Sequence, residues 1–186
     1  MHRRSASTPM DTAFRAIASG EIATVKKLFD STKVVTGPVL EACVDTLERT
    51  GSTAMFAFVL YILEQATSTH LRLIDNQVAT SCLCKILEIV GMNCSEAVSL
   101  LCDRGADPTA GLHHLGRVSD SLNDVWPEYA AILLSKGARP EISSESGSAP
   151  TYWYDLMDSA NARNHARTLF SESTSAACFP PFVYSK

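Results

Sequence analysis

The stretch Leu100-Leu101-Cys102-Asp103-Arg104-Gly105-Ala106-Asp107-Pro108 has a near copy further along the chain, Leu133-Leu134-Ser135-Lys136-Gly137-Ala138-Arg139-Pro140. The two glycines, Gly105 and Gly137, stand 32 residues apart. Internal similarity at such a spacing is typical of proteins built from stacked repeats. The repeated phrase therefore predicts an array of similar structural units.

Each copy of the phrase predicts a helix that stops at its glycine. Glycine adopts the left-handed conformation after a helix C-terminus without a steric penalty, and the proline three residues later prevents the helix from resuming. Before each glycine, apolar residues recur at the spacing of one helix face. They are Ala97, Val98, Leu100 and Leu101 in the first copy, and Tyr129, Ala130, Ile132 and Leu133 in the second.

This pattern resembles the ankyrin repeat, whose second, outer helix runs into a Gly-Ala-Asp-Pro-like turn. The N-terminal region supports the resemblance with a short Ala-rich helix, a glycine turn and a Leu-rich helix. The residues concerned are Ala13, Ala16, Ile17, Gly20, Val25, Leu28 and Phe29, and the inner-helix pattern returns at Val39, Ala42 and Cys43.

Two features depart from the ankyrin pattern. The Thr-Pro-Leu-His signature that opens most ankyrin repeats is absent, and its nearest remnant is Ala149-Pro150-Thr151-Tyr152. Residues 44–94 fit only with longer helices and irregular spacing. Two alternatives therefore stay open: an ordinary helical bundle, and a stack of the tetratricopeptide kind.

The predicted fold is all-α: a helical repeat solenoid of about four to five stacked helix-turn-helix, ankyrin-like units. A disordered tail is expected over 1–10, the repeat domain over 11–172 and a second tail over 173–186. Helices are expected at 11–19, 22–31, 38–50, 53–66, 75–91, 93 or 95 to 105, 109–118, 127–137, 150–160 and 162–171. The last two carry polar residues and are expected to close the stack. No β-alternation is convincing, so no strand is expected.

Composition narrows the classes of partner. The chain of 186 residues has a net charge of −4 and no stripe of lysine and arginine, which argues against binding of nucleic acid. The longest apolar run, 54–63, is too short to cross a bilayer, so no membrane association is expected. The start of the chain lacks a secretory signal and most of the six cysteines fall among apolar residues of predicted helices. Reduced thiols inside the cell, in cytoplasm or nucleus, are therefore expected.

Residues suited to catalysis or metal binding do not form a recognisable motif. Cys82 and Cys84 stand two apart and His113 and His114 are adjacent, so on a helix each pair diverges and cannot share a metal. The chain has neither a nucleophile elbow nor a glycine-rich phosphate loop. We therefore predict no catalytic residue, no cofactor and no metal, and no enzymatic activity.

The resemblance implies where a partner would bind. Ankyrin partners generally lie across the turn tips and the inner helices. Carried onto this sequence, the turn positions are Lys33, Asp107, Thr109, Arg139, Glu141 and Ser144, and the inner-helix positions are Arg15, Glu41, His113, His114, Tyr152 and Trp153. Aromatic residues dominate interface hot spots, which favours Tyr152 and Trp153 as contacts. The alternative is that Trp153 and one tyrosine seal the last core between units.

The expected function is that of a monomeric, non-catalytic module that binds a protein partner through these turn tips and inner helices. A different reading is a regulatory or self-associating domain that controls a linked or partner enzyme. The tail aromatics Phe179, Phe182 and Tyr184 motivate that reading. A small enzyme with an unrecognised site is the third possibility, which a deep polar pocket holding a perturbed titratable group would support.

Overall fold

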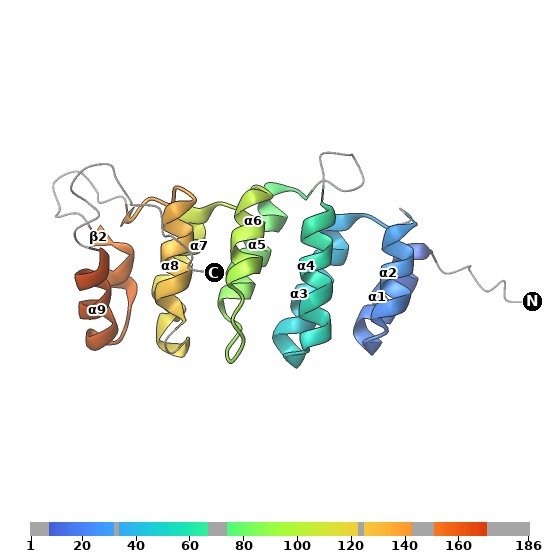
Figure 1. Ribbon diagram of the computed structural model, residues 1–186, viewed down its shortest axis with the longest axis horizontal. Coiled ribbons are helices and arrows are strands. Elements are labelled where there is room, and N and C mark those ends of the chain that lie inside the picture. The colour runs from blue at the N-terminus through green and yellow to red at the C-terminus, as the bar shows by residue number, and fades with distance from the viewer. Residues whose placement is uncertain (1–7, 32–33, 67–73, 123–124, 143–150, 171–186) are drawn as a thin grey trace, which may run out of the picture.

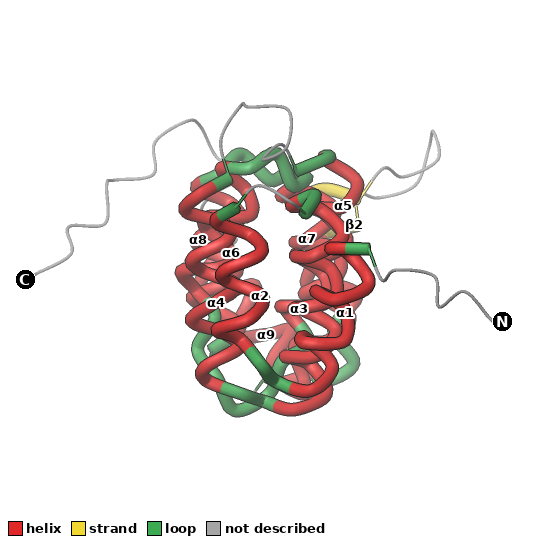
Figure 2. The backbone as a smooth tube through the Cα atoms, turned by 90° about the vertical axis from the view of Figure 1, so that its right-hand side faces the viewer, coloured by secondary structure: helices red, strands yellow, loops and turns green. Residues whose placement is uncertain are grey.

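In the computed structural model, helices stack side by side in two layers along one axis (Figure 1). The structure describes residues 8–31, 34–66, 74–122, 125–142 and 151–170. Consecutive helices run in opposite directions and form pairs, and Figure 2 shows the two layers end-on. The fold is mostly helical, as the sequence predicts.

The inner layer holds the first helix of each pair: α1 (Pro9–Ser19), α3 (Thr36–Thr50), α5 (Asn76–Leu87) and α7 (Pro108–Val118). The outer layer holds the second: α2 (Ile22–Asp30), α4 (Thr53–Gln65), α6 (Ser95–Asp103) and α8 (Trp126–Ser135). Within each layer every helix packs on the corresponding helix of the next pair. A 3₁₀ turn, η1 (Ser119–Ser121), follows α7.

The C-terminal unit is built differently. Strands β1 (Glu141–Ile142) and β2 (Thr151–Tyr152) pair antiparallel, Glu141 opposite Tyr152 and Ile142 opposite Thr151. A 3₁₀ turn, η2 (Trp153–Leu156), and then α9 (Ala160–Phe170) follow, and η2 packs on α7 where another inner helix would stand.

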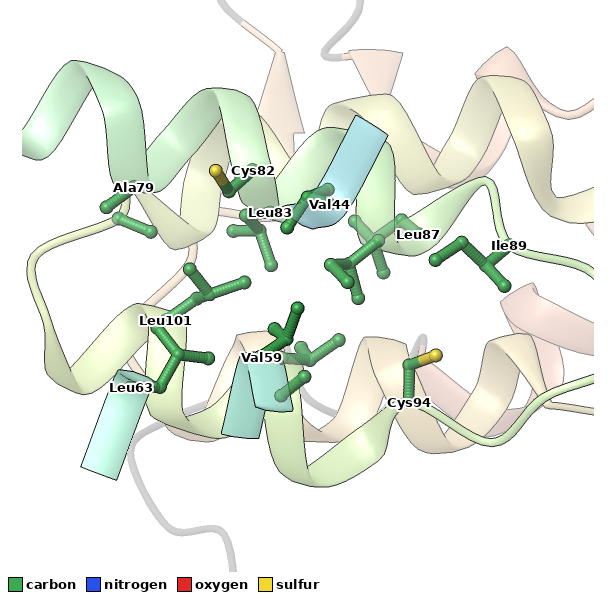
Figure 3. Packing of buried hydrophobic residues seen from close by; sticks show 14 of the residues in the cluster. Val44, Val59, Leu63, Ala79, Cys82, Leu83, Leu87, Ile89, Cys94 and Leu101 are labelled. Atoms are coloured by element: carbon green, nitrogen blue, oxygen red, sulfur yellow. The ribbon is translucent and has the colours of Figure 1, made fainter. Parts of the chain in front are cut away.

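The core lies between the two layers. Val44 of α3, Val59 and Leu63 of α4, Leu83 of α5 and Leu101 of α6 point into it, and all five are fully buried (Figure 3). A helix pair cannot bury its own apolar faces alone, so each pair depends on its neighbours for burial.

The two repeated turns have matching geometry. Gly105 and Gly137 both have positive φ, 96° and 91°, which confirms the predicted left-handed helix stop. The amide of Ala106 donates to the carbonyl of Leu101, and the amide of Ala138 to that of Leu133, both at 3.0 Å. The repeated phrase is thus one turn used twice.

Residues just before these glycines reach the outer helix of the preceding pair. The Arg104 guanidinium donates to the carbonyl oxygens of Leu63, at 2.8 Å, and Glu64, at 3.3 Å, at the end of α4. Lys136, one pair later, makes an ion pair with Asp103 at the end of α6. Both cations lie at a helix C-terminus, where the macrodipole favours positive charge.

Three predicted boundaries are wrong. Helix α1 begins at Pro9, because Thr8 and Asp11 form a capping box, so the tail expected over 1–10 overlaps the first helix. Helix α3 begins at Thr36 rather than at 38. Helix α5 ends at Leu87 rather than at 91, and Gly91 lies in the following loop with φ 82°.

The helix expected over 150–160 is also wrong. Its described part forms β2 and the single turn η2. The amide of Trp153 donates to the carbonyl of Pro140 and the amide of Tyr152 to the carboxylate of Asp155, both at 2.9 Å. These amides therefore do not enter a regular α-helix. The tail expected over 173–186 lies outside the described residues, as do the aromatics Phe179, Phe182 and Tyr184.

Candidate interaction surface

The inner helices share a register that their N-caps define. Thr8 and Asp107 each cap a helix whose next residue is proline, and Asp75 caps α5. The cap oxygens accept from the amides of Asp11, Thr109 and Gln77 at 3.1, 2.8 and 2.8 Å. Helix α3 follows Val35, whose side chain makes no capping bond. Counting from these four residues aligns the helices.

The sixth and tenth residues after each cap stand one helical turn apart and share a face. We call this set the inner face. It comprises Phe14 and Ala18 of α1, Glu41 and Asp45 of α3, Ser81 and Lys85 of α5, and His113 and Arg117 of α7. All eight are exposed or half-buried, so none belongs to the buried core. The register is constant while the chemistry at each position differs from helix to helix.

Charged contacts connect neighbouring inner helices. Lys85 of α5 makes an ion pair with Asp45 of α3, and this hydrogen bond raises the pKa of Lys85. His114 of α7 lies 2.8 Å from Glu88, which follows α5. These side chains are partly exposed, so each pair contributes roughly 0–1 kcal/mol to stability. Their larger consequence is that Asp45 and Glu88 are already paired within the protein.

Two of the predicted turn-tip residues have structural roles. The Asp107 carboxylate caps α7, and the Asp107 amide donates to the Thr80 hydroxyl of α5 at 2.9 Å. The hydroxyl of Thr109 in turn accepts from the amide of Arg139 at 3.1 Å. Each Gly-Ala turn is thus hydrogen-bonded to a threonine of the preceding inner helix.

The other predicted tip residues differ in what they present. Arg139 and Glu141 are exposed, and within the described ranges neither makes an ion pair. Lys33 and Ser144 lie outside the described residues. Among the tip positions that the structure describes, Arg139 and Glu141 have exposed side chains that a partner could contact.

The two histidines of α7 are half-buried on the inner side of the stack. His114 is paired with Glu88. The Nε2 atom of His113 is buried and has no hydrogen-bond partner among the described residues. The sequence places both histidines on the inner helix, but only the structure shows that one is paired and the other is not.

Trp153 is a core residue, which corrects its assignment as a partner contact. Its side chain is 0% exposed and packs against Trp126, Tyr154 and Phe170, with ring centroids 6.2, 6.0 and 5.8 Å away. A buried side chain cannot meet a partner, so the alternative reading, a sealed last core, holds for Trp153. Tyr152 is half-buried and stacks on Tyr154 at 5.3 Å.

Four cysteine thiols of the described helices and loops are poorly suited to nucleophilic chemistry. Burial raises the pKa of Cys43 and Cys82 to about 12, and that of Cys94 and Cys102 to about 11. These thiols are protonated at neutral pH, whereas reactive cysteines need thiolate character. Across the ranges that the structure describes, no group of three or more His, Cys, Asp or Glu side chains is arranged to hold a metal ion. Within those same ranges, no helix combines the length and the apolar character needed to span a bilayer.

Comparisons of the chain with protein-family models, with curated proteins and with solved structures find no match. The function must therefore be argued from the residues of this chain.

Sequence reasoning missed Phe14 as a surface residue of the candidate site. It also missed the signal that fixes its register, the capping box of Thr8 and Asp11 with proline between them. That box is a recognised helix-start pattern, with aspartate in the place of the usual glutamate. It stands directly after a polar run of arginine, serine and threonine, which favoured the reading of a tail.

Proposed function

We propose that this chain is an ankyrin-like module that binds a protein partner across its inner face and turn tips, without catalysis. The helix pairs, their stacking in two layers and the two identical Gly-Ala turns support the ankyrin-like reading. So does the start of α1, Thr8-Pro9-Met10-Asp11, which has the Thr-Pro order that the sequence otherwise lacks.

One observation carries the proposal of binding. The inner face keeps a constant register but presents a different chemistry in each unit: an aromatic ring, carboxylates, a lysine, and then a histidine with an arginine. The stability of the fold does not require particular side chains at exposed positions, because surface substitutions usually change stability by no more than about 0.5 kcal/mol. A rigid frame with variable exposed side chains suits recognition of another protein.

A crosslinking experiment tests the proposed face. A photoreactive phenylalanine analogue replaces Ser81 on the inner face or, as the matched control, the exposed Glu96 on the outer layer. In extract from cells that produce the protein, position 81 is expected to give discrete adducts that excess unlabelled protein removes. Equal adducts at both positions, or none at position 81, would contradict the proposal.

The proposed monomer is tested separately by sedimentation equilibrium at tens of micromolar. A monomer mass supports a partner of another sequence. A dimer mass that falls to monomer after deletion of 173–186 would instead support the self-associating domain.

A further inference from the structure

The first two inner helices expose large apolar side chains. Phe14 of α1 is 40% exposed, and Val35, directly before α3, is 45% exposed. Helices α1 and α3 pack against each other. Exposed apolar side chains carry a solvation cost that a partner packed on them would remove.

The shared register places Phe14 beside α3. Gly116, the ninth residue after the cap of α7, faces the next unit, because a Cβ there would lie 2.3 Å from the carbonyl oxygen of Trp153. The ninth residue after the cap of α1 is Ile17, which is buried. Phe14 precedes Ile17 by three residues and is its neighbour on the helix surface. Phe14 therefore stands at the α3 edge of α1.

Helix α3 carries carboxylates on the same side of the stack. Glu41, Asp45 and Glu48 are spaced four and three apart and form one stripe. Burial, and after it the charge of Glu41, raises the pKa of Cys82 in α5, so Glu41 lies near α5. Lys85 pairs with Asp45, whereas Glu41 and Glu48 make no ion pair within the described part of the chain.

The tenth position after the cap changes sign along the stack, because it holds Asp45 in α3 and Arg117 in α7. At the sixth position, the carboxylate of Glu41 in α3 is replaced by the imidazole of His113 in α7. A partner segment that matches α3 electrostatically is therefore mismatched at α7, and the reverse is also true. Charge complementarity of this kind selects the partner and its position more than it adds affinity.

From this arrangement of exposed apolar and acidic side chains we infer that α1 and α3 bind a protein segment in which a large apolar side chain is flanked by lysine or arginine residues. The apolar side chain packs on Phe14, and the cations face Glu41 and Glu48. This inference rests on the proposed function and names the chemistry of the partner.

The test uses three labelled synthetic peptides as probes for the full chain. The first has a central Leu-Trp pair between lysines, the second replaces every lysine with glutamate, and the third keeps the lysines but replaces Leu-Trp with Ser-Gly. Fluorescence anisotropy measures the Kd, and amide chemical shifts locate the contact. Saturable binding of the first peptide alone, with shifts in α1 and α3, is the expected result.

Matched variants identify the contacts. Phe14→Ser is expected to weaken binding of the first peptide about tenfold, since truncating an aromatic anchor typically costs more than 1 kcal/mol. The double variant Glu41→Lys and Glu48→Lys is expected to weaken it by a similar factor, with a loss of salt dependence. Glu96→Lys on the outer layer is the control and leaves Kd unchanged. Thermal melting of each variant verifies that it folds.

Several outcomes would overturn the inference. One is equal binding of the lysine peptide without Leu-Trp, because the contact would then be non-specific attraction. Another is no saturable binding of the first peptide. A third is tighter binding of the glutamate peptide with chemical-shift changes in α7. In that case the crosslinks at position 81 would persist and the proposed function would stand. Absence of those crosslinks would instead contradict the proposed function.

Discussion

Helix α7 packs against two different neighbours, and the comparison explains how the stack ends. On one side it meets α5 through Gly111, where a Cβ would lie 2.7 Å from a methyl carbon of Leu83. On the other side it meets η2 through Gly116, where a Cβ would lie 2.3 Å from the carbonyl oxygen of Trp153. The regular interface thus places a flexible side chain over a glycine, and the terminal interface places backbone there. The terminal unit, which lacks a full inner helix, thus closes the stack with its backbone against Gly116.

The largest expected effect comes from removing the residue that fills the terminal interface. Trp153→Ala is expected to destabilise the protein by about 3–5 kcal/mol, since it empties a fully buried site. Chemical denaturation with far-UV circular dichroism measures the change. If only the C-terminal unit is destabilised, unfolding shows a separate transition at lower denaturant concentration. A loss of stability below about 1 kcal/mol would show that the terminal interface is dispensable.

The two glycines of α7 allow the comparison to be tested directly. Gly116→Ala is expected to cost roughly 1–3 kcal/mol, because the rigid backbone of Trp153 blocks the added methyl. Gly111→Ala is the matched variant and is expected to change stability by less than about 1 kcal/mol, because Leu83 can move and alanine favours the helix. Equal costs for the two variants would contradict the distinction between the interfaces.

The threonine hydroxyls that hold the turn tips give a smaller effect at the regular interfaces. Thr109→Val leaves the amide of Arg139 without its partner and is expected to cost about 0.5–1.5 kcal/mol. Faster hydrogen exchange at the Arg139 amide is the specific measurement, and Thr109→Ser, which keeps the hydroxyl, is the control. Unchanged exchange in the valine variant would show that water replaces the bond at no cost.

The smallest effect concerns acid stability of the terminal unit. Partial burial opposes ionisation of Asp155, but the bonds from the Tyr152 amide and Arg167 outweigh it and lower the pKa below 3.8. A lowered pKa in the folded state adds stability above the unfolded value of about 3.9, and this is lost as the pH falls through the folded value. Because Arg167 is exposed and Asp155 is only partly buried, solvent screens the pair and its contribution is below about 1 kcal/mol. Asp155→Asn is expected to reduce the change of melting temperature with pH between about pH 5 and pH 2. If the variant keeps the pH dependence of the wild type, other carboxylates cause the effect.

Local signals predicted the regular part of this fold well. The Gly-Ala turns and most helices follow from residues within one turn of each other. The terminal unit does not, because its structure depends on a bond between residues distant in sequence, from the Trp153 amide to the Pro140 carbonyl. Strands of two residues also leave no periodicity to detect.

The candidate site was predictable by position but not by role. The ankyrin resemblance implied that Glu41 and His113 lie on the first helices of their pairs, where the structure has them. It could not show that Asp107 is occupied as a helix cap or that Trp153 is buried. Each role depends on the contacts that the side chain makes in the folded chain. For Trp153, one of these contacts is with Trp126 in another helix.

The bond from Arg104 to the end of α4 has a consequence for synthesis on the ribosome. The carbonyl of Leu63 accepts a hydrogen bond from a donor that lies 41 residues later in the chain. Lys136 likewise reaches back to α6, so each newly made turn completes the helix pair made before it. We therefore expect these two helix pairs to gain their last contacts only after the following pair has been synthesised.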